Sequence, residues 1–178
     1  LAGASLESRN QALLLMAEKI EENQEQILAA NALDVQAATG SLSAPLLSRL
    51  KLTQSKCARM AESLRALAAL PDPLGRVQYA KEICDGMKLY RVVCPIGVIG
   101  VIFESRPDAL VQISSLCLKS GNAVLLKGGR EAERTNEALY NLLIQATNAC
   151  GLPGSWCGLL HSREDVTEML RQHENIDL

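Results

Sequence analysis

The chain has 178 residues, of which 48% are hydrophobic and 21% are charged, and its formal net charge is −2. This balance is typical of one globular domain, or of one domain and part of another, and it excludes a disordered or low-complexity protein. Acidic and basic residues nearly cancel, and aromatic residues make up only 3%. The composition therefore favours neither nucleic acid nor an anionic membrane surface as a partner.

The first 70 residues are predicted to be helical. Apolar residues recur at helical spacing over 13–38, with acidic and amide residues between them. A second helical stretch covers 44–70, with a break near its middle and with Thr53 as the N-cap of its last helix. The segment Pro71–Gly75, with two prolines and a glycine, ends this helical part of the chain.

The remainder is predicted to alternate between strands and helices. Residues 77–87 have no clear preference, and 88–94 are β-like. Four strands then follow with three helices between them, and the first of these strands, Gly97–Phe103, is expected to be buried on both faces. The predicted order is strand 97–103, helix 109–119, strand 123–127, helix 131–150, strand 156–160, helix 165–172 and strand 176–178. This order indicates an α/β fold in which a parallel sheet carries crossover helices.

The chain is expected to have two parts, a helical segment 1–75 that packs on a sheet domain 76–178. Because it begins with Leu1 and ends within a predicted strand, we expect it to be a fragment with an incomplete sheet. The longest apolar run is strand-sized, and a signal-peptide pattern is absent, so we expect a cytoplasmic location and no membrane partner.

Polar turns follow three of the predicted strands, and ligands of open α/β sheets bind at such strand ends. In the first turn, Pro107 and Asp108 suit the start of a helix. Ser105 and Arg106, with the backbone N–H groups beside them, would form a pocket for a carboxylate, phosphate or oxyanion. An ordinary helix cap with a surface arginine is the alternative interpretation. The three turns are Glu104–Asp108, Lys127–Glu131 and His161–Asp165.

The second turn places two cations around two glycines. Gly128 and Gly129 would let a ligand approach the backbone, and Lys127 and Arg130 would pair with phosphate. A tight strand-to-helix turn without a ligand is the alternative. The segment is not a P-loop, because its lysine precedes the glycines, and the chain has no Gly-x-Gly-x-x-Gly motif.

The sequence offers no strong candidate for a metal centre or a nucleophile. His161 and His173 are its two histidines, and they belong to no four-ligand zinc set. No serine lies in a nucleophile elbow. The six cysteines lack a Cys-x-x-Cys pair, and we expect them to be reduced structural thiols, with Cys94 and Cys117 buried and unreactive.

Two long motifs resemble those of the gamma-glutamyl phosphate reductase family, also called glutamate-5-semialdehyde dehydrogenases, within the aldehyde dehydrogenase superfamily. They are Cys94–Asp108 (CPIGVIGVIFESRPD) and Ser120–Ala132 (SGNAVLLKGGREA). Shorter words agree with the same family, so the resemblance covers essentially the whole chain. These words are Arg9–Leu13, Ile27–Asn31 with Asp34, and Leu70–Gly75.

The resemblance implies a Rossmann-like, aldehyde dehydrogenase-like fold and an oxidoreductase of proline biosynthesis. The family reduces L-glutamyl 5-phosphate with NADPH to L-glutamate 5-semialdehyde and releases phosphate, using a cysteine thiolate. Family members are much longer than this chain. The resemblance therefore implies that the catalytic cysteine lies downstream of Leu178, that no catalytic residue is present here, and that the chain alone is inactive.

Site residues are carried over by position. The resemblance implies a substrate site at Glu104, Ser105 and Arg106, and it places Lys127 near the adenine ribose of NADP. Arg130 and Glu131 are weaker candidates for the ribose region. The full cofactor set is Ile102, Phe103, Lys127, Gly128, Gly129 and Arg130. A homo-oligomer and functional coupling to glutamate 5-kinase, as a separate or a fused protein, are further implications.

Two alternatives remain open. The chain could come from another aldehyde dehydrogenase relative with a different acyl substrate, although the motif Glu104–Pro107 argues against it. It could also be a non-catalytic nucleotide-binding module, although the open sheet edge expected at Ile176–Leu178 argues against that.

Overall fold

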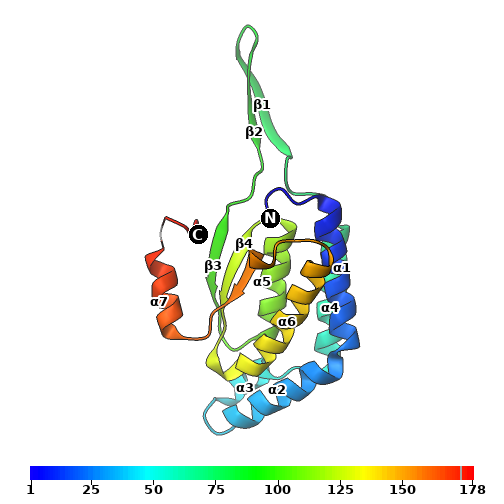
Figure 1. The fold of residues 1–178 in the computed structure, drawn as a ribbon, viewed down its shortest axis with the longest axis vertical. Helices are drawn as coiled ribbons and strands as arrows, with labels where there is room; N and C mark the ends of the chain where they lie inside the picture. The colour runs from blue at the N-terminus through cyan, green and yellow to red at the C-terminus, as the bar shows by residue number, and fades with distance from the viewer. Residues whose placement is uncertain (173) are drawn as a thin grey trace.

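The computed structural model describes residues 1–172 and 174–178. It confirms the α/β fold, with four N-terminal helices, a β-hairpin and a parallel sheet with crossover helices (Figure 1). The helices are α1 (Leu6–Glu22), α2 (Gln24–Ala38), α3 (Ala44–Leu50), α4 (Gln54–Ala69), α5 (Pro107–Lys119), α6 (Glu133–Ala149) and α7 (Arg163–Arg171). The strands are β1 (Val77–Cys84), β2 (Met87–Val92), β3 (Val98–Ile102), β4 (Ala123–Lys127) and β5 (Cys157–Leu159).

The N-terminal helices form largely as the apolar spacing predicts. The continuous helical pattern is interrupted at Asn23, whose side-chain amide donates to the carbonyl of Lys19 and separates α1 from α2. Thr53 caps α4 as expected, because its hydroxyl accepts from the N–H of Lys56 at 3.2 Å. None of the helices, among the residues described, is long and apolar enough to cross a bilayer.

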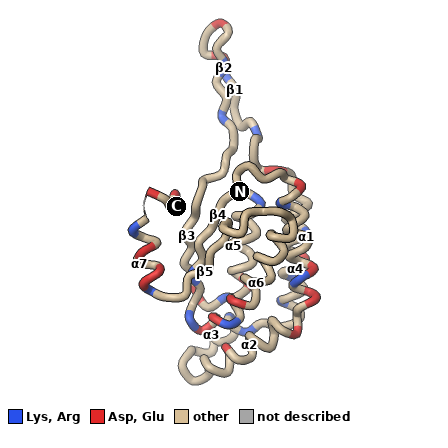
Figure 2. Tube along the Cα trace, in the orientation of Figure 1, with Lys and Arg blue, Asp and Glu red and all other residues tan. Residues whose placement is uncertain are grey.

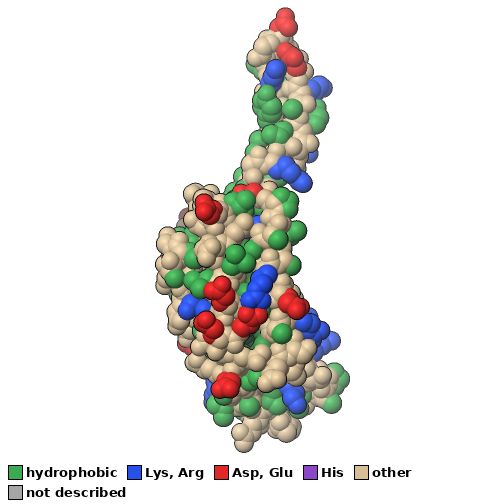
Figure 3. Space-filling view, turned by 90° about the vertical axis from the view of Figure 1, so that its right-hand side faces the viewer, with side chains coloured by type: hydrophobic (Ala, Val, Ile, Leu, Met, Phe, Trp, Pro, Cys, Tyr) green, Lys and Arg blue, Asp and Glu red, His purple; other side chains and the backbone are tan. Residues whose placement is uncertain are grey.

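Residues 77–92, which carried no clear prediction over their first part, form an antiparallel hairpin. The hairpin projects away from the body of the molecule (Figure 1), and every residue of β1 and β2 is exposed. Its turn contains Asp85 and Gly86, and Gly86 has a φ of +77° that favours glycine. Hydrophobic side chains run along both of its strands (Figure 3). The predicted boundary at residue 75 lies just before this arm.

The main sheet has the order β3-β4-β5, and both pairs of strands are parallel. The predicted fourth strand is present only as a short pairing. The N–H of Asp177 donates to the carbonyl of Val98 at 2.8 Å, and Gly100 donates to Leu178 at 2.7 Å. The final residues thus lie along the outer edge of β3.

The strand β3 is only half-buried, contrary to the expectation that both of its faces are covered. Helices α5 and α6 pack against one face of the sheet, and within residues 1–172 and 174–178 α7 is the one helix on the other face (Figure 1). Met169 of α7 approaches Gly100 closely, but Ile102 at the end of the strand remains 58% exposed. The continuous apolar run therefore overstated the burial of this strand.

The hydrophobic core lies between the helices and the sheet. Helices α1 and α4 pack against α5 and α6, so apolar side chains from the N-terminal helices and from the sheet domain form one cluster. Trp156 is its largest member and donates its indole N–H to the hydroxyl of Thr147 at 3.1 Å.

Two buried polar side chains in α2, Asn31 and Asp34, belong to one of the short segments that resemble the reductase family. The Asn31 side chain accepts from the N–H of Leu52 at 2.7 Å and donates to the carbonyl of Leu50. Asp34 accepts from both the N–H and the hydroxyl of Thr135 at the start of α6. These residues hold α2 against α6 and the α3–α4 turn, so their role is structural.

A second buried polar cluster joins α1, α4 and α5. The Lys119 ammonium, at the end of α5, donates to the side chain of Asn10 and to the carbonyls of Ala68 and Leu70. Arg9 donates to the Lys119 carbonyl and forms an ion pair with Asp72 at 2.8 Å. Burial lowers the pKa of the Lys119 ammonium.

Candidate functional site

The turn that follows β3 leads directly into α5. Pro107 occupies the first position of the helix and Asp108 lies in its first turn, as predicted, and Arg106 is the N-cap. The N–H of Phe103 donates to the carbonyl of Lys127 at 2.9 Å, which continues the pairing of β3 with β4. The backbone of the turn is therefore fixed at the carboxyl end of the sheet.

A cleft of about 860 Å³, the strand-end cleft, lies on one side of this turn at the ends of the parallel strands. It contains all six residues predicted to bind the cofactor. Charged residues of both signs gather in this region of the molecule (Figure 2). The cleft is lined by Ile102, Phe103, Lys127, Gly128, Gly129, Arg130, Glu131, His161, Arg163, Val166 and Thr167.

The two glycines are enclosed by protein atoms. A Cβ at Gly128 would lie 2.3 Å from Nδ2 of Asn136, and one at Gly129 would lie 2.5 Å from Oγ of Ser105. The sequence interpretation assigned the glycines to the approach of a ligand. In the structure they are required first because neighbouring side chains occupy the space above them.

The charges of the strand-end cleft are arranged to attract an anion. Glu131 accepts a hydrogen bond from the Ser105 hydroxyl at 2.7 Å, which is the main reason why the pKa of its carboxyl is lowered. The Lys127 ammonium lies over the turn and donates to the carbonyl of Gly128 at 2.6 Å. Arg130 and Arg163 add two further cations to the lining.

The residues can accommodate a nucleotide cofactor with phosphate groups. Three cations of the cleft suit phosphate. A smaller hollow that shares Lys127–Arg130 and His161 with the cleft is also lined by Asn136. Oδ1 of Asn136 is buried and has no hydrogen-bond partner among the residues described. A ligand hydroxyl could donate to it.

Sequence reasoning missed the contribution of α7. It noted the polar turn His161–Asp165 but assigned no role to His161, Arg163 or Thr167, all of which line the strand-end cleft. Asp165 accepts from the N–H groups of His161 and Ser162, and the Ser162 bond is the main reason why its pKa is lowered. The turn is a capping box, and this sequence pattern alone gives no sign of the cleft.

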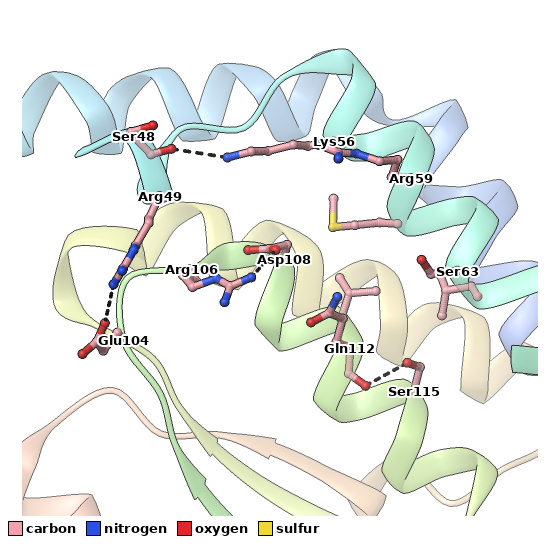
Figure 4. A pocket seen from close by; sticks show the side chains of 13 residues that line it. Ser48, Arg49, Lys56, Arg59, Ser63, Glu104, Arg106, Asp108, Gln112 and Ser115 are labelled. Carbon is pink, nitrogen blue, oxygen red and sulfur yellow. Dashed lines mark hydrogen bonds and ion pairs between the residues drawn. The ribbon is translucent and has the colours of Figure 1, made fainter. Parts of the chain in front are cut away.

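A second cleft of about 640 Å³, the helix cleft, lies between α4 and α5 on the other side of the turn (Figure 4). Its polar lining includes two ion pairs, Arg49 with Glu104 at 3.4 Å and Arg106 with Asp108 at 3.0 Å. It is lined by Ser48, Arg49, Lys56, Arg59, Met60, Ser63, Leu64, Glu104, Arg106, Asp108, Val111, Gln112 and Ser115.

The three residues predicted to bind the substrate are divided between the two clefts. Glu104 and Arg106 line the helix cleft. The Ser105 hydroxyl points to the other side, toward Glu131 and Gly129 of the strand-end cleft. The turn therefore forms the wall between a cleft at the strand ends and a cleft between helices.

The cysteines only partly follow the prediction. None of the six forms a disulfide, and Cys57, Cys117 and Cys157 are buried. Burial raises the pKa of the Cys157 thiol to about 12. The expectation that Cys94 is buried is wrong, because it lies exposed where the chain leaves the projecting hairpin, and Cys84 on β1 is exposed as well.

Metal-ligating residues do not gather in the described part of the chain. Among residues 1–172 and 174–178, no group of three or more His, Cys, Asp or Glu side chains is placed to hold a metal ion. His173, the second histidine considered in the sequence, lies outside the described residues.

Comparison with known proteins connects this architecture to one group of enzymes. No protein-family model matches the chain. The gamma-glutamyl phosphate reductases of Ruminiclostridium cellulolyticum and Pelotomaculum thermopropionicum are each 50% identical to it over 179 residues, which cover 100% of this chain and 41% of theirs. The chain thus spans about two-fifths of the length of these curated relatives.

Solved structures agree. The gamma-glutamyl phosphate reductase of Thermotoga maritima superposes with a TM-score of 0.92 at 34% identity, over 98% of this chain and 43% of that one. The gamma-glutamyl phosphate reductase of Saccharomyces cerevisiae superposes with a TM-score of 0.91 at 35% identity, over 98% of this chain and 45% of that one. A probable aldehyde dehydrogenase from Listeria monocytogenes, at 12% identity and a TM-score of 0.72 over 99% of this chain and 36% of that one, shares the fold. Over its whole length, the chain is homologous to part of the gamma-glutamyl phosphate reductases, within an aldehyde dehydrogenase-like fold.

Proposed function

We propose that the chain is the NADP-binding part of an enzyme that reduces L-glutamyl 5-phosphate to L-glutamate 5-semialdehyde, the second step of proline biosynthesis from glutamate. The observation that carries this proposal is the position of the turn Ile102–Asp108 between two clefts. A substrate in one cleft and a cofactor in the other would meet at the turn.

The strand-end cleft is the proposed cofactor site. Lys127 and Arg130 hold the phosphate-bearing adenosine end, with Lys127 near the ribose and with Phe103 and Ile102 against the apolar parts of the cofactor. NADPH carries a 2′-phosphate that NADH lacks, and paired cations at this position favour it. When bound, NADPH supplies the hydride for the reduction.

The helix cleft and the turn are the proposed substrate side. Arg106, at the N-cap of α5, holds an anionic part of the substrate. The Ser105 hydroxyl, which donates to Glu131 in this structure, turns to donate to the reacting carbonyl oxygen when substrate binds. A cysteine thiolate attacks the acyl carbon and inorganic phosphate leaves. Bound NADPH would supply the hydride that reduces the resulting thioester to the aldehyde, and the thiolate would be released.

The thiol nucleophile is proposed to lie beyond Leu178. The buried Cys57, Cys117 and Cys157, and the partly buried Cys150 at the end of α6, have raised pKa values, which burial causes in each case. Cys84 lies on the projecting hairpin, and Cys94 precedes the first strand of the sheet, at the end opposite the two clefts. None of these thiols is placed to attack a substrate at the turn.

The exposed apolar hairpin supports a homo-oligomer. Val77, Tyr79, Leu89 and Tyr90 are each about half exposed on an arm that contacts little of its own chain. Exposed apolar surface of this kind is typical of an interface, and we assign it to a second copy of the protein. A cytoplasmic enzyme of this type would also couple functionally to glutamate 5-kinase, because its acyl phosphate substrate hydrolyses readily in water.

Assay of the complete protein tests the function. It should reduce NADP when L-glutamate 5-semialdehyde and phosphate are supplied, which is the reverse reaction and avoids the labile acyl phosphate. The 178-residue chain alone should bind NADPH without turnover. A complete protein that oxidises simple aldehydes but not glutamate 5-semialdehyde would overturn the substrate assignment. Turnover by the chain alone, abolished by replacement of one of its six cysteines, would overturn the location of the nucleophile.

A further inference from the structure

The helix cleft carries more positive charge than the rest of the protein. Four cationic side chains and two carboxylates line it, whereas the whole chain has a formal net charge of −2. The cations come from three separate elements: Arg49 from α3, Lys56 and Arg59 from α4, and Arg106 from the turn before α5. Residues distant in the sequence thus converge on one hollow.

The two carboxylates do not neutralise all four cations. Glu104 pairs with Arg49 and Asp108 pairs with Arg106. Lys56 donates to the backbone carbonyls of Ser48 and Lys51, at the turn between α3 and α4. For Arg59 the described part of the chain provides no carboxylate within ion-pair distance, so its guanidinium is free to bind an anion.

The rest of the lining suits a short aliphatic chain. Figure 4 shows Lys56 and Arg59 along α4, opposite Arg106 and Gln112, with the cleft between them. Met60, Leu64 and Val111 supply its apolar lining. The cleft therefore combines an unpaired cation, an apolar floor and carboxylates at the end nearest the turn.

We propose that the helix cleft binds the α-amino-acid end of the substrate, with Arg59 on the α-carboxylate and Asp108 on the α-ammonium. This inference rests on the proposed function and identifies the part of the substrate that is not chemically changed. A guanidinium accepts a carboxylate through two parallel hydrogen bonds. The three-carbon chain then reaches the turn, where the reacting carbonyl lies between the two clefts.

The zwitterionic end provides substrate specificity. An aldehyde that lacks either charge leaves Arg59 or Asp108 without its partner and binds less tightly. Because neither contact changes during the reaction, its loss should raise KM and leave kcat nearly unchanged. This signature distinguishes the two residues from Arg106, which adjoins the reacting centre.

Three aldehydes separate the two contacts in the complete protein. They are L-glutamate 5-semialdehyde, 5-oxopentanoate, which lacks the ammonium group, and 4-aminobutanal, which lacks the carboxylate. Arg59→Met should raise KM by about ten- to a hundredfold for the first two aldehydes, the loss of one charge-assisted contact, and should leave 4-aminobutanal unaffected. Asp108→Asn should raise KM for L-glutamate 5-semialdehyde and for 4-aminobutanal, and should leave KM for 5-oxopentanoate unchanged.

Arg65→Met is the matched control. Arg65 is an exposed arginine on the same helix, it pairs with Glu21, and it does not line the cleft. Arg65→Met should leave the KM values for all three aldehydes unchanged. Arg59→Lys, which keeps the positive charge, should recover part of the affinity lost in Arg59→Met. If Arg59→Met raised KM equally for all three aldehydes, or for none of them, the inference would be overturned. The proposed function would still stand as long as the wild type acted on glutamate 5-semialdehyde. An inactive wild type would instead remove the proposed function.

Discussion

Two groups of cations in this chain have opposite surroundings. Lys119 and Arg9 are 3% and 2% exposed, and their hydrogen bonds connect α1, α4 and α5. Lys127 and Arg130 line an open cleft, and Arg130 is exposed. A buried cation must be satisfied by the protein itself, whereas a cation in a cleft can be satisfied by a ligand. The first group should therefore govern stability, and the second should govern binding.

The largest effect is expected from Lys119→Met. This change keeps the length of the side chain but leaves three acceptors without their donor, one of them buried and two partly buried. We expect the free energy of unfolding to fall by about 2–4 kcal/mol, measured by urea unfolding of the chain. Lys127→Met, the matched change in the cleft, should leave the unfolding transition almost in place. Equal effects of the two changes would remove the distinction between the two groups.

Lys127→Ala should have the largest effect on binding. We expect NADPH affinity to fall by about ten- to a hundredfold, because one charge-assisted contact is lost. The loss for NADH should be much smaller. Arg130→Ala should act in the same direction and more weakly, since its side chain is exposed. Calorimetric titration with both cofactors decides the matter. If the affinities for NADPH and NADH fell equally, Lys127 would contact the ribose hydroxyls and not the 2′-phosphate.

Arg106→Lys tests whether Arg106 acts on the substrate or on the cofactor. The change keeps the charge but removes the planar fork that pairs with an anion. We expect a lower kcat/KM for L-glutamyl 5-phosphate in the complete protein, with the Kd for NADPH nearly unchanged. A collapse of NADPH affinity would instead place Arg106 on the cofactor side of the turn.

The smallest effect concerns pH and Asp72. Burial alone would raise the pKa of its carboxyl, but the N–H of Leu74 and the Arg9 guanidinium outweigh burial and lower it. A depressed folded-state pKa stabilises the protein above the unfolded-state value, about pH 4, and this stabilisation is lost as the pH falls through the folded-state pKa. Wild type should therefore exceed Asp72→Asn by no more than about 1 kcal/mol near neutral pH, and the difference should shrink in acid. A difference that is constant with pH would exclude the ionised carboxylate as its source.

Much of the fold follows from local pattern. The helical character of the N-terminal part, the crossover helices and the end of β4 at Lys127 match the apolar spacing and the glycine signals of the sequence, whereas the break between α1 and α2 at Asn23 was not predicted. The hairpin was only partly predicted because its strands are exposed on both faces and have no core to impose alternation. The exposure of Cys94 was missed for the same reason.

The residues that line the strand-end cleft could be predicted from the sequence, whereas the arrangement of the two clefts could not. Strand-end position indicated Lys127 and the glycines after it, and the family resemblance added Ile102 and Phe103, which line the same cleft. The helix cleft was not predicted, because Lys56 and Arg59 read as the solvated face of an amphipathic helix. Their approach to Arg106 depends on how α4 packs on α5, and no spacing within α4 encodes it.

The pairing of the last residues with β3 has a consequence for synthesis. The N–H of Val98 donates to the side chain of Asp177, which lies 79 positions later in the chain. At roughly 5–20 residues per second, the outer edge of β3 is translated about 4–16 s before the segment that covers it. During that interval the unpaired edge can bind another strand. The nascent chain can therefore mispair at its first parallel strand, because the N–H groups on the outer edge of that strand find their partners only after Asp177 and Leu178 have been made.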